Sequence, residues 1–153
     1  MQKSGKIMKI GSYELELFPE KTRAGYDRCS EEKDDMALCL FRYLLSGAKK
    51  ESLIFLESLG LDPEKIPLAR PLAPPDEEGM VLFHCTAALC ARLLHGGDTT
   101  PRQSEEEAGV SMVFVSREAD FTPGRQRMFE KEVEIRFVME LPFDPAFFEG
   151  REA

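Results

Sequence analysis

Both histidines of this chain and two of its four cysteines lie within a single twelve-residue segment. His84 and Cys85 begin the segment, Cys90 follows, and His95 ends it. Imidazole and thiolate groups bind transition metals and act as bases or nucleophiles near neutral pH. Any metal or thiol chemistry of this protein is therefore expected to centre on this segment.

The spacing of these four residues argues against a metal site if the segment is a helix. His84 and His95 would then lie about 16 Å apart along the helix axis, too far to bind one ion. Cys85 and Cys90 would diverge around the helix, whereas zinc ligands usually have two to four residues between them. If residues 80–84 form a strand instead, the two cysteines gain freedom to converge with a cysteine from elsewhere in the chain. The spacing favours small core cysteines, with a zinc site at all four residues as the alternative.

Nucleophilic catalysis has little support in the same segment. A catalytic cysteine needs a base within hydrogen-bond reach and a third group that orients the base. On a helix, His84 and Cys85 would point about 100° apart, and Cys90 would lie more than a turn from His95. The chain also lacks glycine-rich phosphate-binding motifs and the Gly-x-Ser-x-Gly motif. We therefore expect a non-enzymatic protein with no catalytic residues and no cofactor, zinc being the alternative.

Length and composition indicate a single domain over 1–153. A chain of 153 residues, 42% of them hydrophobic, can bury a sizeable core. The proline-rich connection 67–75 and the polar loop 96–108 are expected to lie inside that domain. No apolar run approaches the roughly 20 residues of a membrane span, and the N-terminus does not resemble a signal peptide. Because such a core needs no disulfides, we expect reduced cysteines and a cytoplasmic location.

Net charge restricts the classes of partner. The chain carries −8, and residues 77–153 hold 8 basic and 15 acidic residues, a net −7. Nucleic acid binding requires clustered Lys and Arg, and the only basic pairs are Lys49-Lys50 and Arg125-Gln126-Arg127. We therefore expect neither nucleic acid nor a membrane as a partner.

Hydrophobic periodicity predicts an α+β fold. Strands are expected near 7–18, 110–117 and 131–141, and helices over 30–46, 50–59 and 79–95. Residues 79–95 also fit a strand over 80–84 followed by a helix, but their Ala and Leu content favours helix throughout. The order of elements predicts a small antiparallel sheet with helices packed on one face.

Apolar features outside the sheet point to a protein partner. The helix core 36–45 is apolar on nearly every face, so other elements or a partner must cover it. Phe143, Phe147 and Phe148 follow the last strand, where they either pack back on the core or form an interaction surface. The edges of a small sheet also favour pairing with a second copy.

The sequence therefore favours a small, acidic, cytoplasmic interaction protein that self-associates as a homodimer. One alternative is a metal- or thiol-dependent protein that uses His84, Cys85, Cys90 and His95. Another is a protein that binds a small molecule in a pocket between helices and sheet.

Overall fold

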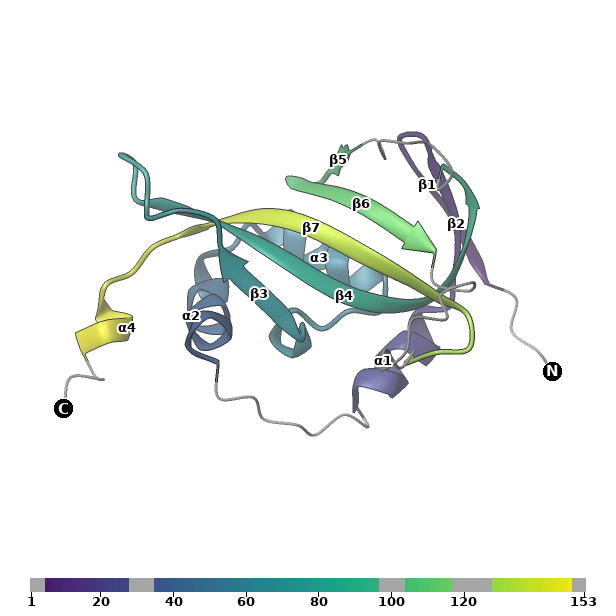
Figure 1. The fold of residues 1–153 in the computed structure, drawn as a ribbon, viewed down its shortest axis with the longest axis horizontal. Helices are drawn as coiled ribbons and strands as arrows, with labels where there is room; N and C mark the ends of the chain where they lie inside the picture. The colour runs from purple at the N-terminus through teal and green to yellow at the C-terminus, as the bar shows by residue number, and fades with distance from the viewer. Residues whose placement is uncertain (1–4, 28–34, 97–103, 117–127, 150–153) are drawn as a thin grey trace, which may run out of the picture.

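An antiparallel sheet of seven strands forms the body of the molecule (Figure 1). The computed structural model describes residues 5–27, 35–96, 104–116 and 128–149. The strands are β1 (Lys6–Ile10), β2 (Tyr13–Leu17), β3 (Leu68–Pro71), β4 (Met80–His95), β5 (Glu105–Glu107), β6 (Val110–Ser116) and β7 (Glu132–Pro142). The helices are α1 (Pro19–Asp27), α2 (Met36–Leu44), α3 (Lys50–Ser58) and α4 (Ala146–Glu149), with 3-10 turns η1 (Leu45–Gly47) and η2 (Pro63–Lys65). The α+β class and the antiparallel sheet are thus confirmed.

The prediction of a helix over 79–95 is wrong, because this segment is strand β4. Its inward side chains alternate and are buried: Val81, Phe83, Cys85, Ala87, Leu89 and Ala91. Strand β7 carries a matching inward row and pairs with β4 from Met80 opposite Pro142 to Cys90 opposite Glu132. Helix propensity differs by only a few tenths of a kcal/mol for most residues. Burial of the alternating row against β7 outweighs that preference.

The strands follow one another in the order β1-β2-β4-β7-β6-β5, and β3 pairs separately with β4. In Figure 1, α3 lies behind the sheet and α2 lies beside β3, and buried residues of both helices, such as Phe41 and Leu56, join the core. The far edge of the sheet curls back toward the β1–β2 hairpin. There, the backbone N–H and the hydroxyl of Ser12 both donate to Glu105 Oε1, at 3.1 and 2.9 Å.

One edge of β4 is shared between two short strands that leave a gap. Strand β3 pairs with β4 up to Thr86, and β2 pairs with it from Ala91 onward. In the gap, the Tyr26 hydroxyl accepts from the Ala88 N–H (2.7 Å) and donates to the Ala88 carbonyl (2.8 Å). Helix α1 thus supplies from a side chain the hydrogen bonds that a neighbouring strand would otherwise provide.

The next outward-facing backbone groups in the gap are satisfied in the same way. The Cys90 N–H donates to Thr22 Oγ1 (2.9 Å), and the Phe18 N–H donates to the Cys90 carbonyl (3.0 Å). Thr22 is fully buried, and its hydroxyl donates in turn to the Phe18 carbonyl (3.2 Å). The start of α1 is therefore fixed against β4 by short polar contacts.

The remaining predictions are confirmed in part. The strands near 7–18, 110–117 and 131–141 correspond to β1–β2, β6 and β7, and the helix over 50–59 corresponds to α3. Within the predicted helix 30–46, α2 begins at Met36. Asp35 caps it, because its side chain accepts hydrogen bonds from the N–H groups of Ala37 and Leu38. Residues 30–34, where this helix was predicted to begin, lie outside the described residues. The segments 67–75 and 96–108 contain β3 and β5, which were not predicted, and α1 was not predicted either.

Removing the Tyr26 hydroxyl tests the bridge across the gap. Tyr26→Phe leaves the N–H and carbonyl of Ala88 without these partners, and we expect a loss of about 1–3 kcal/mol in unfolding free energy. The matched control is Tyr43→Phe, because Tyr43 is 43% exposed and its hydroxyl makes a long 3.4 Å contact with Asp144. We expect the control to change stability by less than about 0.5 kcal/mol. Urea unfolding measures both, and equal effects would contradict the bridging role.

Candidate functional site

The four residues proposed from the sequence as a metal site lie along β4 and do not converge. Cys85 points inward and is fully buried, whereas His84 and Cys90 lie on the opposite face of the strand. His95 ends the strand, opposite Glu14. Within the described residues, no group of three or more His, Cys, Asp or Glu side chains could hold a metal ion. The zinc alternative therefore finds no ligand set in this part of the chain.

The thiols differ in environment. Burial among apolar side chains raises the pKa of Cys85 far above the usual thiol range. Cys39 is half-buried on α2, and Cys29, the remaining cysteine, lies outside the described residues. Cys39, Cys85 and Cys90 are all free thiols.

The aromatic residues after β7 pack mainly inward. Phe147 is only 5% exposed, and its ring lies 5.3 Å from that of Tyr43 on α2. Phe143 is half-buried against the core. The side chain of Phe148 lies outside the described part of the structure. The two described rings thus follow the packing alternative, and Phe147 presents little surface to a partner.

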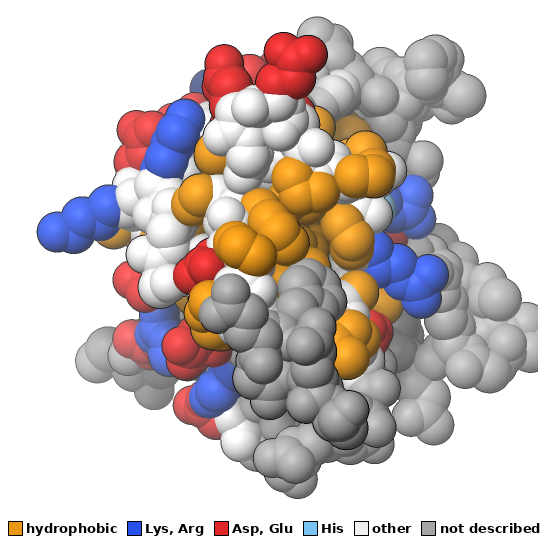
Figure 2. All heavy atoms as spheres, turned by 90° about the vertical axis from the view of Figure 1, so that its left-hand side faces the viewer, with side chains coloured by type: hydrophobic (Ala, Val, Ile, Leu, Met, Phe, Trp, Pro, Cys, Tyr) orange, Lys and Arg blue, Asp and Glu red, His pale blue; other side chains and the backbone are white. Residues whose placement is uncertain are grey.

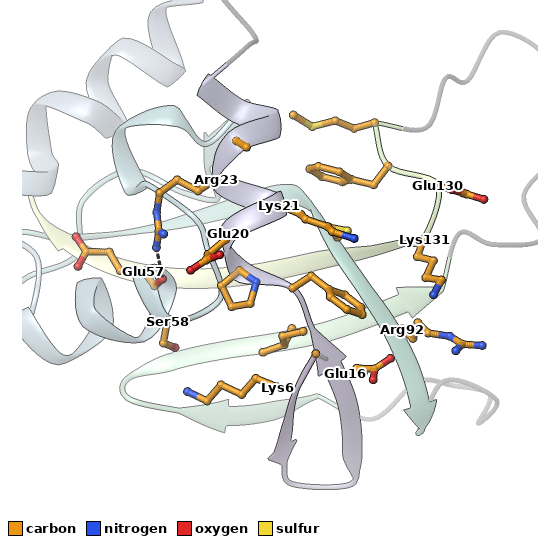
Figure 3. A pocket seen from close by; sticks show the side chains of 18 residues that line it. Lys6, Glu16, Glu20, Lys21, Arg23, Glu57, Ser58, Arg92, Glu130 and Lys131 are labelled. Carbon is orange, nitrogen blue, oxygen red and sulfur yellow. Dashed lines mark hydrogen bonds between the residues drawn. The ribbon is translucent and has the colours of Figure 1, made fainter. Parts of the chain in front are cut away.

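A different site is found where α1 meets the sheet. A groove of about 1530 Å³ lies between α1, the β1–β2 hairpin, the C-terminal half of β4 and the segment before β7 (Figure 3). Its charged lining residues are Lys6, Lys21, Arg23, Arg92, Lys131, Glu16, Glu20, Glu57 and Glu130. Arg23 and Glu57 lie at one end of the groove, and Lys21, Lys131 and Arg92 lie at the other.

Two lysines flank a single aromatic ring at the second end. The ammonium nitrogen of Lys21 lies 5.2 Å from the centroid of the Phe18 ring, and that of Lys131 lies 5.8 Å from it. Both distances are within the range of cation–π attraction. Within the residues that the structure describes, neither lysine forms an ion pair with a carboxylate. Arg92 lies opposite Glu16 in the β2–β4 register, so its charge has an acidic neighbour.

The backbone around the groove holds these lysines in place. Lys21 precedes Thr22, whose hydroxyl is bonded to β4. The Lys131 carbonyl accepts from the Ala91 N–H (3.1 Å), which attaches this segment to the far edge of β4. The two ammonium groups therefore come from segments more than a hundred residues apart that are both bonded to one strand.

The segment 128–131 is fixed by a buried carboxylate. Glu132 is 8% exposed, and its Oε1 accepts from the N–H groups of Met128 (2.6 Å) and Phe129 (3.2 Å). The Phe129 ring packs on α1, 6.4 Å from the Tyr26 ring. A Cβ atom at Gly25 would come within 2.4 Å of the Phe129 ring, so glycine is what allows this close approach.

Cys90, on β4, is one of the residues that line the groove. Cys90 is only 8% exposed. Burial raises the pKa of the Cys90 thiol, and the positive charges of Lys21 and Lys131 lower it in part. The two lysines are thus close enough to Cys90 to influence the pKa of its thiol.

The chemistry of this end of the groove is suited to binding an anion. Two ammonium groups beside an apolar ring attract carboxylate or phosphate oxygens and present a surface for apolar groups. Histidine is absent from the described lining, and the Cys90 thiol has no adjacent base there.

Comparison with known proteins gives no information about the groove. No protein-family model, curated protein or solved structure matches the chain. Among the described residues, no helix has the length and apolar character needed to span a membrane.

No pattern in the sequence reveals the groove. Phe18 and Lys21 belong to one segment, Arg92 and Lys131 belong to two others, and Lys21 and Lys131 each have an acidic neighbour in sequence. Only the pairing of α1 and β7 with β4 brings them together. The basic pairs noted in the sequence, such as Lys49-Lys50, do not line the groove.

Removing the buried carboxylate tests how the groove wall is held. Glu132→Ala leaves the N–H groups of Met128 and Phe129 without their acceptor, and we expect a loss of about 2 kcal/mol in unfolding free energy. Glu140→Ala on the same strand is the control, because Glu140 is exposed and should change stability by less than about 0.5 kcal/mol. Urea unfolding with both variants makes the comparison. Similar losses for the two would contradict the anchoring role of Glu132.

Alkylation of Cys90 tests the reach of the lysine charges. In the variant Lys21→Gln/Lys131→Gln, the lowering influence on the Cys90 pKa is gone, so that pKa rises further. Less thiolate is then present at any pH below it, and iodoacetamide should modify Cys90 more slowly at pH 8–9 than in the wild type. Peptide mapping by mass spectrometry gives the rate, with Cys39 as the internal control. A Cys90 rate that does not fall would place the lysines too far away to matter.

Proposed function

We propose that this protein is a non-catalytic binding module whose groove takes an acidic segment of a protein partner. The observation that carries the proposal is the pair of lysines beside Phe18, without ion-pair partners among the described residues, in a chain of net charge −8. Two lysines in the groove of an acidic protein, with no carboxylate paired to them in the described part of the chain, favour an anionic ligand.

The size of the groove favours a polypeptide over a small molecule. Pockets for small ligands have volumes of about 300–1,000 Å³ and enclose most of the ligand. This groove, at about 1530 Å³, is larger and is bordered by charged side chains from four segments. An extended or turn-forming peptide with carboxylates and an apolar side chain would contact both lysines and the Phe18 ring together.

The free thiols support a reducing compartment for this binding. Cys39, Cys85 and Cys90 form no disulfide, and burial protects Cys85 from reaction. We therefore propose a cytoplasmic location, and we propose that self-association belongs to the same function.

Titration with an acidic peptide tests the groove directly. We expect a fluorescent peptide that alternates Glu with Leu to bind with an affinity that falls as salt rises from about 50 to 300 mM, because salt screens the lysine charges. Lys21→Gln/Lys131→Gln should weaken binding about tenfold or more and flatten the salt dependence. Fluorescence anisotropy measures both.

The matched control is Lys49→Gln/Lys50→Gln, which removes the same charge outside the groove. We expect it to bind the peptide like the wild type. If both double variants lose affinity equally, binding depends on net charge and the groove is not the site. A peptide of Lys and Leu that binds better than the acidic peptide would also contradict the proposal.

A further inference from the structure

The end of the molecule opposite the groove carries a projecting hairpin. Strands β3 and β4 pair out to Pro71 opposite Phe83, and the Leu72 N–H donates to the Leu82 carbonyl (2.8 Å) just beyond. The turn that follows is ordered by Asp76, whose Oδ1 accepts from the N–H groups of Glu78 and Met80, both at 2.9 Å. The hairpin is thus a defined projection from the sheet.

This end combines exposed apolar side chains with acidic ones. We define the acidic arm as residues 71–82 of the hairpin together with residues 140–147, which adjoin the hairpin at the end of β7. The side chains of Leu72 and Leu82 are 57% and 46% exposed. Within the acidic arm, the sequence has five acidic residues and no Lys, Arg or His. Figure 2 shows apolar side chains gathered over this end, with acidic side chains above and beside them and Lys or Arg side chains at the flanks.

Two of the five carboxylates serve the local structure, and the others remain on the surface. Asp76 orders the turn, and Asp144 accepts from the Ala146 N–H (3.0 Å). Glu77 and Glu78 are exposed at the tip of the hairpin. The arm therefore presents carboxylates next to leucine side chains, which is the combination that the groove is suited to bind.

The acidic arm and the groove lie at opposite ends of one molecule. In Figure 1 the β3–β4 hairpin projects at one end, and α1 and the β1–β2 hairpin, which border the groove, lie at the other. The arm therefore cannot fold back into the groove of its own chain. A second copy, however, brings an arm to every groove.

We infer that the acidic arm of one copy binds in the groove of the next. This inference rests on the proposed function, because it names the acidic partner as a second copy of this chain. Glu77 and Glu78 of one copy approach Lys21 and Lys131 of the other, and Leu72 packs near the Phe18 ring. Such an interface joins two different surfaces, so the assembly grows head to tail into a ring or an open chain. In this proposal, head-to-tail assembly takes the place of the homodimer expected from the sequence.

Two variants separate the surfaces. The arm variant is Leu72→Ser/Glu77→Gln/Glu78→Gln, and the groove variant is Lys21→Gln/Lys131→Gln. All five positions are exposed, so we expect wild-type urea midpoints, and those midpoints are checked first. Sedimentation velocity at about 10–200 μM should show concentration-dependent oligomers for the wild type that shrink with salt. Each variant alone should be monomeric.

Mixing the variants gives the decisive result. The arm variant keeps its groove and the groove variant keeps its arm, so an equimolar mixture should form a 1:1 dimer and no larger species. Lys49→Gln/Lys50→Gln should assemble like the wild type. Oligomers that persist in both single-surface variants, or a mixture that stays monomeric, would overturn the inference.

The outcomes also separate this inference from the proposed function. A wild type that stays monomeric to 200 μM while its groove binds the acidic peptide would overturn self-assembly and leave the groove proposal intact. A wild type that assembles while the peptide does not bind would overturn both, because the assembly would then use another surface.

Discussion

The structure depends on how the exposed edge of β4 is satisfied between its two short partners. A strand edge presents backbone groups that cost free energy when they are buried without a hydrogen-bond partner. Here the hydroxyls of Tyr26 and Thr22, together with the Phe18 N–H, fill the positions of a missing strand. β4 can therefore run unbroken through sixteen residues and connect both ends of the molecule.

The same contacts build the groove. Because Thr22 is bonded to the backbone of Cys90, the first turn of α1 directs Lys21 over the Phe18 ring. On the opposite edge, β4 bonds to the Lys131 carbonyl, and Glu132 orders the residues before it. The hydrogen bonds that complete the sheet also bring two cations from distant parts of the chain to one aromatic ring. The hydrogen bonds that satisfy the strand edge thus also form the proposed binding surface.

Local patterns in the sequence were sufficient for several elements. The clear alternation of strand β7 and the apolar pattern of α3 were enough to predict both elements. Local patterns were insufficient for β4, because Leu82, Ala88 and Cys90 make the outward row of this strand nearly as apolar as its inward row. Alternation is weak in such a strand, and the helix propensity of Ala and Leu decided the prediction. Only the long-range pairing with β7 shows which structure is adopted.

The groove lay beyond sequence reasoning for the same reason. Its cations are single residues whose proximity depends on the β4 pairings. Native-state hydrogen exchange at the Ala88 and Cys90 amides measures directly whether α1 satisfies this edge of β4. Both amides are expected to exchange as slowly as amides in the β4–β7 ladder, and Tyr26→Phe should increase the exchange rate of Ala88 more than that of Cys90. Rapid exchange of both amides in the wild type would show that α1 does not satisfy the edge, and the position of the groove would lose its basis.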